Sequence, residues 1–153
     1  MTRLELKIPP PLVGALVALG MWALSALGPS LGLLPGLRVV VVALLVLAGL
    51  TFDVLGLLAF LGAHTTINPL RPERSSALVT GGIYRVTRNP MYVGMALLLT
   101  AWAVHLGGLW AWLGPVAFVL YITRFQIQPE ERILDGLFGD EYRAWCARVR
   151  RWL

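Results

Sequence analysis

Residues 39–63 read VVVVALLVLAGLTFDVLGLLAFLGA, and this apolar run decides the class of fold. A helix needs about 17 to 25 predominantly apolar residues to cross a bilayer. Three more apolar stretches, at residues 11–27, 90–106 and 107–123, lie near the lower limit of that length. The chain of 153 residues is 58% hydrophobic and only 14% charged, far from the average of soluble domains. We therefore predict an all-α integral membrane protein, a single domain of about four transmembrane helices with cytoplasmic amphipathic helices at its C-terminal end.

The basic residues predict the orientation of these spans. All but one of the 13 Lys and Arg residues precede the first stretch, lie between the second and third, or follow the fourth, and the exception is Arg38. By the positive-inside rule, both ends of the chain and the polar loop at residues 65–89 face the cytoplasm. The net charge of +5 is explained in this way, and no clustered basic groove with stacking aromatics indicates a nucleic-acid partner.

The third and fourth stretches are separated only by Gly107-Gly108, so we expect a tight antiparallel helical hairpin with a kink at Pro115. The polar loop before it contains paired glycines and Asn-Pro and Arg-Pro turn signals, which predict a structured loop. At its end, Asn89 is a favourable N-cap and Pro90 a favourable first helical residue. The free N–H groups of such a helix start suit an anion such as a carboxylate, although a plain capped helix with a basic flank also explains the segment.

The second polar region, residues 124–153, contains two further helix signals. QPEE at residues 128–131 predicts a helix start with two acids in its first turn. FGD at residues 138–140 predicts a helix stop and a new N-cap, and apolar residues recur at helical spacing over residues 142–153. The last helix can lie in the headgroup plane or cover a pocket as a lid, and the sequence leaves both open.

Three ordered blocks carry a family resemblance: LVTGGIY at residues 78–84, RNPMYVG at residues 88–94, and Glu130-Glu131 followed by FGDEY at residues 138–142. In these blocks the chain resembles the isoprenylcysteine carboxyl methyltransferase (ICMT) family, to which phospholipid methyltransferases are similar. The resemblance covers residues 65–153, and residues 1–64 resemble the family only as a generic two-span scaffold. It implies a bacterial-type member in the inner membrane with its active site facing the cytoplasm.

The resemblance also implies a reaction, the transfer of a methyl group from S-adenosyl-L-methionine to a lipophilic or small-molecule acceptor with a carboxylate, thiol or amine. The cofactor is expected between the hairpin, the preceding loop and the C-terminal helices, with membrane lipids around them. The residues implied to bind it are Leu78, Val79, Tyr84, Asn89, Pro90, Tyr92, Glu130 and, as the less favoured partner of its amino group, Glu131. It implies no metal and leaves the catalytic residue, the acceptor and the oligomeric state open.

Two positions depart from the family pattern. Asn89 stands where eukaryotic members usually have His, so we expect hydrogen bonding but no proton transfer there. Gln126 aligns with a substrate-contacting arginine and Arg124 lies close by, so both are candidate substrate residues. The chain has one cysteine, Cys146, and two histidines, His64 and His105, and their spacing matches no metal-binding motif.

Two other functions stay open on the sequence. A membrane reductase of the sterol-reductase kind, dependent on NAD(P)H, has a similar Asn-Pro block but usually an acid where this chain has Met95. A non-enzymatic membrane scaffold would not need Asn89 and Glu130 at one pocket. Asp53 lies in the middle of the longest apolar stretch, where a carboxyl group is costly. Such a residue marks either a functional site or a pairing site, and the resemblance gives it no role.

Overall fold

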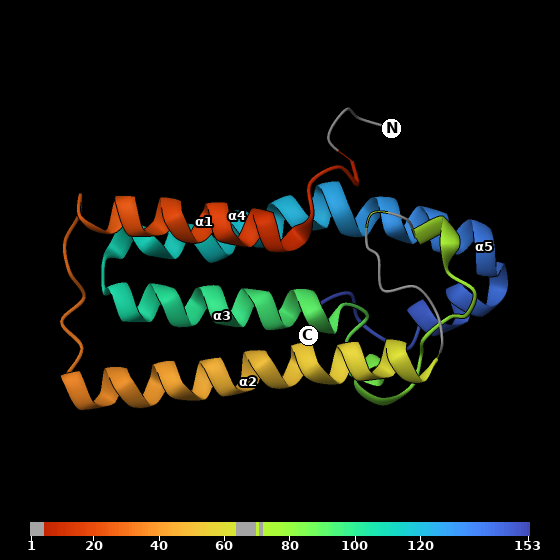
Figure 1. Ribbon diagram of the computed structural model, residues 1–153, viewed down its shortest axis with the longest axis horizontal. Coiled ribbons are helices and arrows are strands. Elements are labelled where there is room, and N and C mark those ends of the chain that lie inside the picture. The colour runs from red at the N-terminus through yellow and green to blue at the C-terminus, as the bar shows by residue number, and fades with distance from the viewer. Residues whose placement is uncertain (1–4, 64–69, 71) are drawn as a thin grey trace.

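Apolar helices that run side by side form the body of the protein, which a computed structural model describes for residues 5–63, 70 and 72–153 (Figure 1). Every named element in that part of the chain is a helix, so the predicted all-α class is confirmed. The four apolar helices alternate in direction and are α1 (Pro10–Ser25), α2 (Pro35–Gly62), α3 (Pro90–Leu106) and α4 (Leu113–Ile122). Among the described helices α2 alone is both long and apolar enough to cross a membrane, so the count of four spans stays a prediction.

Proline and glycine set the ends of the helices. α1, α2 and α3 each have a proline in the first turn, where a fixed φ favours the helix and no N–H is needed. α3 ends at Gly107, whose φ of 68° is the left-handed C-cap conformation. Its bounds coincide with the predicted apolar stretch. A short 3-10 turn, η3 (Leu109–Trp112), then leads into α4, so the predicted hairpin is confirmed.

Pro115 lies in the first turn of α4, where its missing N–H breaks no hydrogen bond, so the mid-helix kink predicted there is not supported. The turn between α3 and α4 instead pairs with the connection between α1 and α2. Leu31 donates its N–H to the carbonyl oxygen of Gly107 at 2.6 Å, and Leu109 donates to that of Pro29 at 3.0 Å. These bonds hold the two connections together at the end of the bundle opposite α5.

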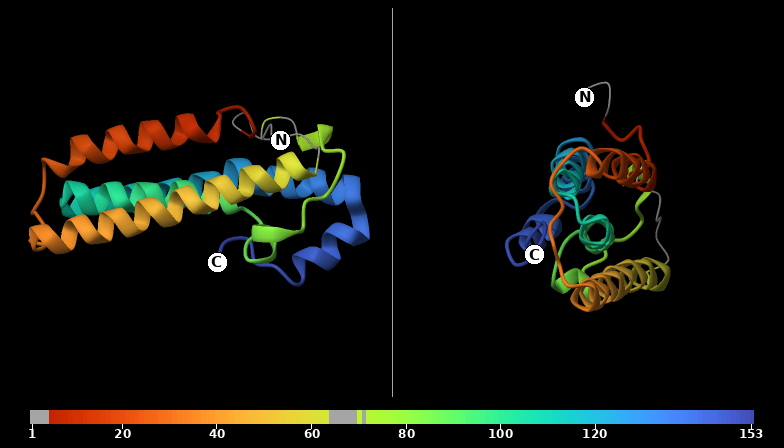
Figure 2. Two further views of the ribbon diagram at one scale, coloured as in Figure 1. Left: turned by 60° about the horizontal axis from the view of Figure 1, so that its bottom comes forward. Right: turned by 90° about the vertical axis from the view of Figure 1, so that its left-hand side faces the viewer.

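α3 is the central helix, with α2 on one side and α1 and α4 on the other (Figure 2). Glycines allow α2 and α3 to approach closely: a Cβ at Gly94 would overlap the Asp53 carboxylate and lie 2.7 Å from the Gly49 carbonyl oxygen. On the other side, Met21, Phe118 and other buried side chains fill the space between α1, α3 and α4. Much of α2 exposes leucine and valine, as a helix facing lipid does.

The fourth helix does not stop where the sequence predicts a new start. α4 passes through a π-helical turn, η4 (Thr123–Ile127), directly into α5 (Gln128–Cys146). The helix start predicted at residues 128–131 is confirmed, since α5 begins at Gln128 with both acids in its first turn, although the π turn joins it to α4 without a break. Pro129 is tolerated because it follows a π turn, whose wider i→i+5 pattern already interrupts the ordinary α-helical bonding. The predicted break at residues 138–140 is confirmed, since Gly139 has φ 51° and ψ −122° and kinks α5.

The C-terminal segment, residues 147–153, folds back and is not helical, so the helix predicted over residues 142–153 ends at Cys146. Its carbonyl groups bind the start of α3 instead: Arg88 donates its N–H to the carbonyl oxygen of Arg150 at 2.9 Å. The polar loop before α3 contains two 3-10 turns, η1 (Pro72–Arg74) and η2 (Gly82–Arg85), which confirms a structured loop over its described residues. Loop, α3 start, α5 and tail meet at one end of the bundle.

Candidate functional site

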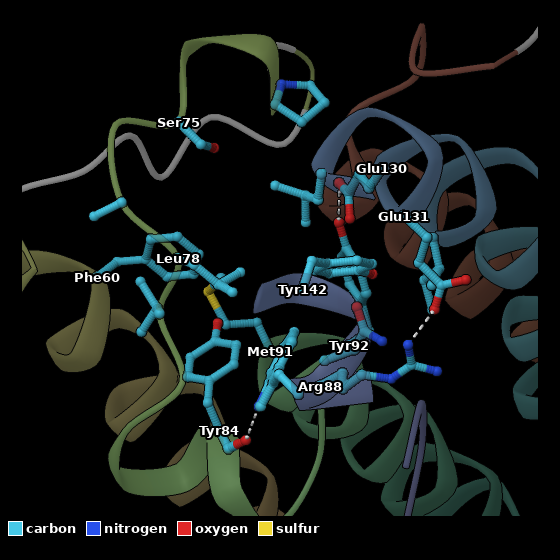
Figure 3. A pocket seen from close by; sticks show the side chains of 17 residues that line it. Phe60, Ser75, Leu78, Tyr84, Arg88, Met91, Tyr92, Glu130, Glu131 and Tyr142 are labelled. Atoms are coloured by element: carbon cyan, nitrogen blue, oxygen red, sulfur yellow. Dashed lines mark hydrogen bonds and ion pairs between the residues drawn. The ribbon is translucent and has the colours of Figure 1, made fainter. Parts of the chain in front are cut away.

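A cavity lies at this end of the bundle, enclosed by the last turn of α2, the loop, the start of α3 and α5 (Figure 3). It brings together seven of the residues that the sequence implied for a cofactor, namely Leu78, Val79, Tyr84, Asn89, Tyr92, Glu130 and Glu131. Pro90 does not line it, because its ring is buried against Gly56 of α2 behind the cavity wall. The assignment of these residues to a cofactor stays a prediction.

Glu130 is the acid that faces the cavity. The Tyr92 hydroxyl and the Gln126 amide both donate to its Oε1, at 2.9 and 2.5 Å. No arginine or lysine of the described residues forms an ion pair with it. Burial raises the pKa of Glu130 to about 7, and the two donated hydrogen bonds only partly oppose this. An anionic Glu130 is therefore costly until a cation binds beside it.

Glu131, its neighbour, is already neutralised. Arg151 donates to both of its carboxylate oxygens, at 2.9 and 2.6 Å, in the two-pronged geometry of a strong ion pair. Arg88 lies further away, with Nη1 3.3 Å from Oε1 of Glu131. The contacts thus differ between these two adjacent acids, and they favour Glu130, the residue that the resemblance also favours, as the one that can receive a cation.

Arg88 also lines the cavity, and sequence reasoning did not place it among the site residues. Its Nη1 donates to the Cys146 sulfur at 2.6 Å, and its side chain is 15% exposed. Its Nε–H is buried and has no hydrogen-bond partner among the described residues. A buried guanidinium with an unpaired donor at a cavity is suited to bind an anion. The signal that could have identified Arg88 was its position as the first residue of the RNPMYVG block at residues 88–94.

The start of α3 is formed differently from the prediction. Asn89 occupies the N-cap position, but its side chain caps nothing in α3. Its amide nitrogen donates instead to the carbonyl oxygen of Arg151 at 2.9 Å. Asn89 therefore attaches the cavity wall to the C-terminal segment. Thr87, fully buried, donates to the same carbonyl oxygen at 3.2 Å.

An aromatic wall forms the side of the cavity nearest α2. Tyr84 meets Phe60 edge to face, with 5.5 Å between ring centroids, and Trp145 donates its indole N–H to the carbonyl oxygen of Tyr84 at 3.3 Å. Burial raises the pKa of Tyr84, so its phenol stays neutral. Phe60, Met91 and Trp145 line the cavity without having been predicted. Trp145 was visible only as part of an apolar helical face, and Phe60 gave no signal that distinguishes it from the rest of α2.

The two candidate substrate residues, Arg124 and Gln126, have different partners. Arg124 points away from the cavity and binds Glu5 of the N-terminal segment at 2.9 Å. Gln126 is buried and is connected to the site by its hydrogen bond to Glu130. A role for either in contacting the acceptor stays a prediction.

The other polar residues weighed in the sequence lie outside the cavity or outside the described residues. Asp53 lies against Gly94 between α2 and α3, and its Oδ1 has no hydrogen-bond partner in the described part of the chain. Thr51 is not that partner, because its hydroxyl donates to the Leu47 carbonyl oxygen at 2.7 Å. His105 stacks on Trp102, and His64 lies outside the described residues.

Comparison with known proteins gives the family. A family model for phospholipid methyltransferases matches residues 37–141. An uncharacterised protein of Haemophilus influenzae is 51% identical over 63 residues, which cover 41% of this chain and all of that protein. Protein-S-isoprenylcysteine O-methyltransferase B of Arabidopsis thaliana is 30% identical over 90 residues, which cover 57% of this chain and 44% of the plant enzyme. The chain thus spans less than half of that enzyme's length.

No solved structure matches the chain significantly. The family match begins in α2 and runs through the loop, the hairpin and α5 as far as Glu141, so it covers almost all of the cavity wall. The resemblance read from the motif blocks is confirmed, and this chain belongs to the phospholipid methyltransferase family of membrane methyltransferases, which is related to the isoprenylcysteine methyltransferases.

Proposed function

We propose that this protein transfers a methyl group from S-adenosyl-L-methionine to a lipophilic or small-molecule acceptor, and that the cofactor binds in the cavity between the loop, α3 and α5. One observation carries the proposal. Glu130, an acid without a cationic partner among the described residues, shares the cavity with Arg88, a buried guanidinium with an unpaired Nε–H. The amino-acid end of the cofactor has one ammonium and one carboxylate, which match these two groups in charge.

The remaining walls suit the rest of the cofactor. Leu78 and Val79 offer apolar surface, and Phe60 and Tyr84 offer aromatic surface, as a nucleoside with a flat base requires. The cofactor supplies a methyl group on a positively charged sulfonium. The residues of this chain would bind and orient it and exclude water, so that the acceptor attacks in line. No general base is assigned, because a carboxylate or thiolate acceptor needs none.

The location is part of the proposal. Apart from Arg38, the basic residues that the structure describes lie in segments at this end of the bundle, so the cavity would face the cytoplasm in a bacterial inner membrane. An acceptor from the surrounding lipid and an acceptor from solution are both compatible with a cavity at that level.

Calorimetry on the detergent-purified protein with S-adenosylhomocysteine and, separately, NADPH tests the proposal. We expect S-adenosylhomocysteine to bind and NADPH not to bind. Glu130→Gln should weaken binding, whereas Glu141→Gln, a matched change at an exposed acid of the same helix, should not. Binding of NADPH alone would favour a reductase, and binding of neither ligand would favour a scaffold. Mass spectrometry of lipids and small metabolites after incubation with isotope-labelled cofactor then identifies the acceptor.

A further inference from the structure

We propose that Arg151 is a positioning residue of the cofactor site: by neutralising Glu131, it leaves the Arg88 guanidinium available for the carboxylate of the cofactor. This inference rests on the proposed function. It assigns a role to the C-terminal segment, for which the sequence left two possibilities open, a lid over a pocket or an anchor at the lipid surface. Residues 147–153 form no helix, and they fold back onto the start of α3.

The hydrogen bonds around Glu131 are unequal. Arg151 binds it with Nε at 2.9 Å and Nη2 at 2.6 Å, one bond to each carboxylate oxygen. Arg88 makes a single longer contact at 3.3 Å, which is visible beside the cavity in Figure 3. Both carboxylate oxygens are thus satisfied by Arg151. Arg88, one of the residues that line the cavity, retains a buried Nε–H without a hydrogen-bond partner among the described residues.

The position of Arg151 is fixed through its backbone, independently of its side chain. Its carbonyl oxygen accepts hydrogen bonds from Asn89 at 2.9 Å and from Thr87 at 3.2 Å. On the next residue, Trp152 donates its indole N–H to the Thr123 hydroxyl at 3.1 Å. A change in the Arg151 side chain therefore leaves these attachments in place.

Charge balance gives the consequence. Glu131, Arg88 and Arg151 together carry one net positive charge, which one carboxylate from the cofactor would neutralise. Glu131 is mostly buried in the structure, and without the Arg151 side chain it would keep only Arg88 as a cation among its described partners. A buried carboxylate holds a lone cation tightly, so Arg88 would be drawn to Glu131 and the cofactor carboxylate would meet a neutral pair.

Binding measurements with two ligands test this role. The ligands are S-adenosylhomocysteine and its decarboxylated analogue, which keeps the amino group but lacks the carboxylate. The variants are Arg151→Gln, the double variant Glu131→Gln/Arg151→Gln, and Arg150→Gln as the matched control at an exposed arginine. Arg151→Gln should weaken S-adenosylhomocysteine binding by about tenfold, as loss of one charge-assisted contact does, and leave binding of the analogue unchanged.

The double variant should recover most of the lost affinity, because no unpaired Glu131 remains to hold Arg88. Arg150→Gln should bind like the original protein. Equal weakening of both ligands by Arg151→Gln would indicate a general structural role and overturn the proposal. The proposal would also be overturned if the double variant bound S-adenosylhomocysteine no better than Arg151→Gln. It would be overturned as well if both Arg151→Gln and the double variant failed to fold. If the unmodified protein does not bind S-adenosylhomocysteine, the proposed function fails with this inference; unchanged binding in Arg151→Gln overturns the inference alone.

Discussion

Replacing Glu130 with glutamine is expected to weaken cofactor binding and, at the same time, to stabilise the cofactor-free protein. Both effects come from one fact, that burial raises the pKa of this acid from its ordinary 4.5 to about 7. Glutamine can still accept the hydrogen bonds from Tyr92 and Gln126. It cannot become an anion, so it removes the cost of the buried charge and also the proposed partner of the cofactor's ammonium.

The sign of the stability effect follows from proton linkage. Between about pH 4.5 and 7 the folded protein holds a proton on Glu130 that the unfolded chain has lost, so stability falls as pH rises through this window and stays low above it. The difference between the two pKa values corresponds to at most about 3 kcal/mol. Glu130→Gln should recover part of this at neutral pH and raise the unfolding temperature.

Affinity should change in the opposite direction. Loss of a charge-assisted contact weakens binding by about 1.5 to 3 kcal/mol, roughly 10- to 150-fold. In the unmodified protein, a pKa of about 7 means that affinity for S-adenosylhomocysteine falls about tenfold between about pH 8 and about pH 6, as Glu130 takes up its proton. In Glu130→Gln the affinity should be independent of pH over the same interval.

Calorimetric titrations at three pH values in this interval, combined with thermal unfolding followed by tryptophan fluorescence, measure both effects. Glu141→Gln on the same helix is the control and should change neither. The reasoning is refuted if the unmodified protein binds equally well across the interval. It is also refuted if Glu130→Gln loses stability together with affinity, because Glu130 would then hold the fold together.

Two further changes test the neighbours of this site. Gln126→Ala removes a hydrogen bond that lowers the pKa of Glu130, so the pH midpoint of cofactor binding should move above about 7 in the same titrations; an unmoved midpoint would contradict the role given to Gln126. Gly94→Ala places a Cβ into the Asp53 carboxylate and should cost about 1 to 3 kcal/mol of stability by overpacking, measured as a lower unfolding temperature. Gly81→Ala, where a Cβ meets nothing within 4 Å, is its control, and equal losses in both would disprove the close helix contact.

The ends of the apolar helices could be predicted because their signals are local. Pro90 and Gly107 mark the ends of α3 by backbone conformation alone, and the structure ends the helix there. The C-terminal segment was mispredicted because helical spacing over residues 142–153 says nothing about distant partners. There the carbonyl groups of Arg150 and Arg151 accept hydrogen bonds from Arg88 and Asn89, residues about 60 positions earlier that local spacing cannot identify as partners.

For the candidate site too, some features could be predicted from the sequence and others could not. The motif blocks predicted which segments meet, and the cavity lies between them. They favoured Glu130 over Glu131 but gave no physical reason, because the difference in contacts depends on Arg151, a residue 20 positions after Glu131. They also could not show that the Arg88 side chain reaches the cavity. Phe60 lies on an apolar helix where many residues could equally have faced lipid.

The π turn η4 has a consequence for how such a site can arise in a membrane helix. An α-helix advances by about 100° per residue, so the one extra residue that a π turn accommodates rotates everything after it by about that angle. Phe118 and Ile122, before the turn, face the apolar bundle, and Glu130, after it, faces the cavity. Deleting one residue between Thr123 and Ile127 would restore an even helix and swing Glu130 out of the cavity without changing any side chain in α5. A single extra residue in a π turn is thus enough to let one continuous helix pack apolar side chains in the bundle before the turn and present an acid to the cavity after it.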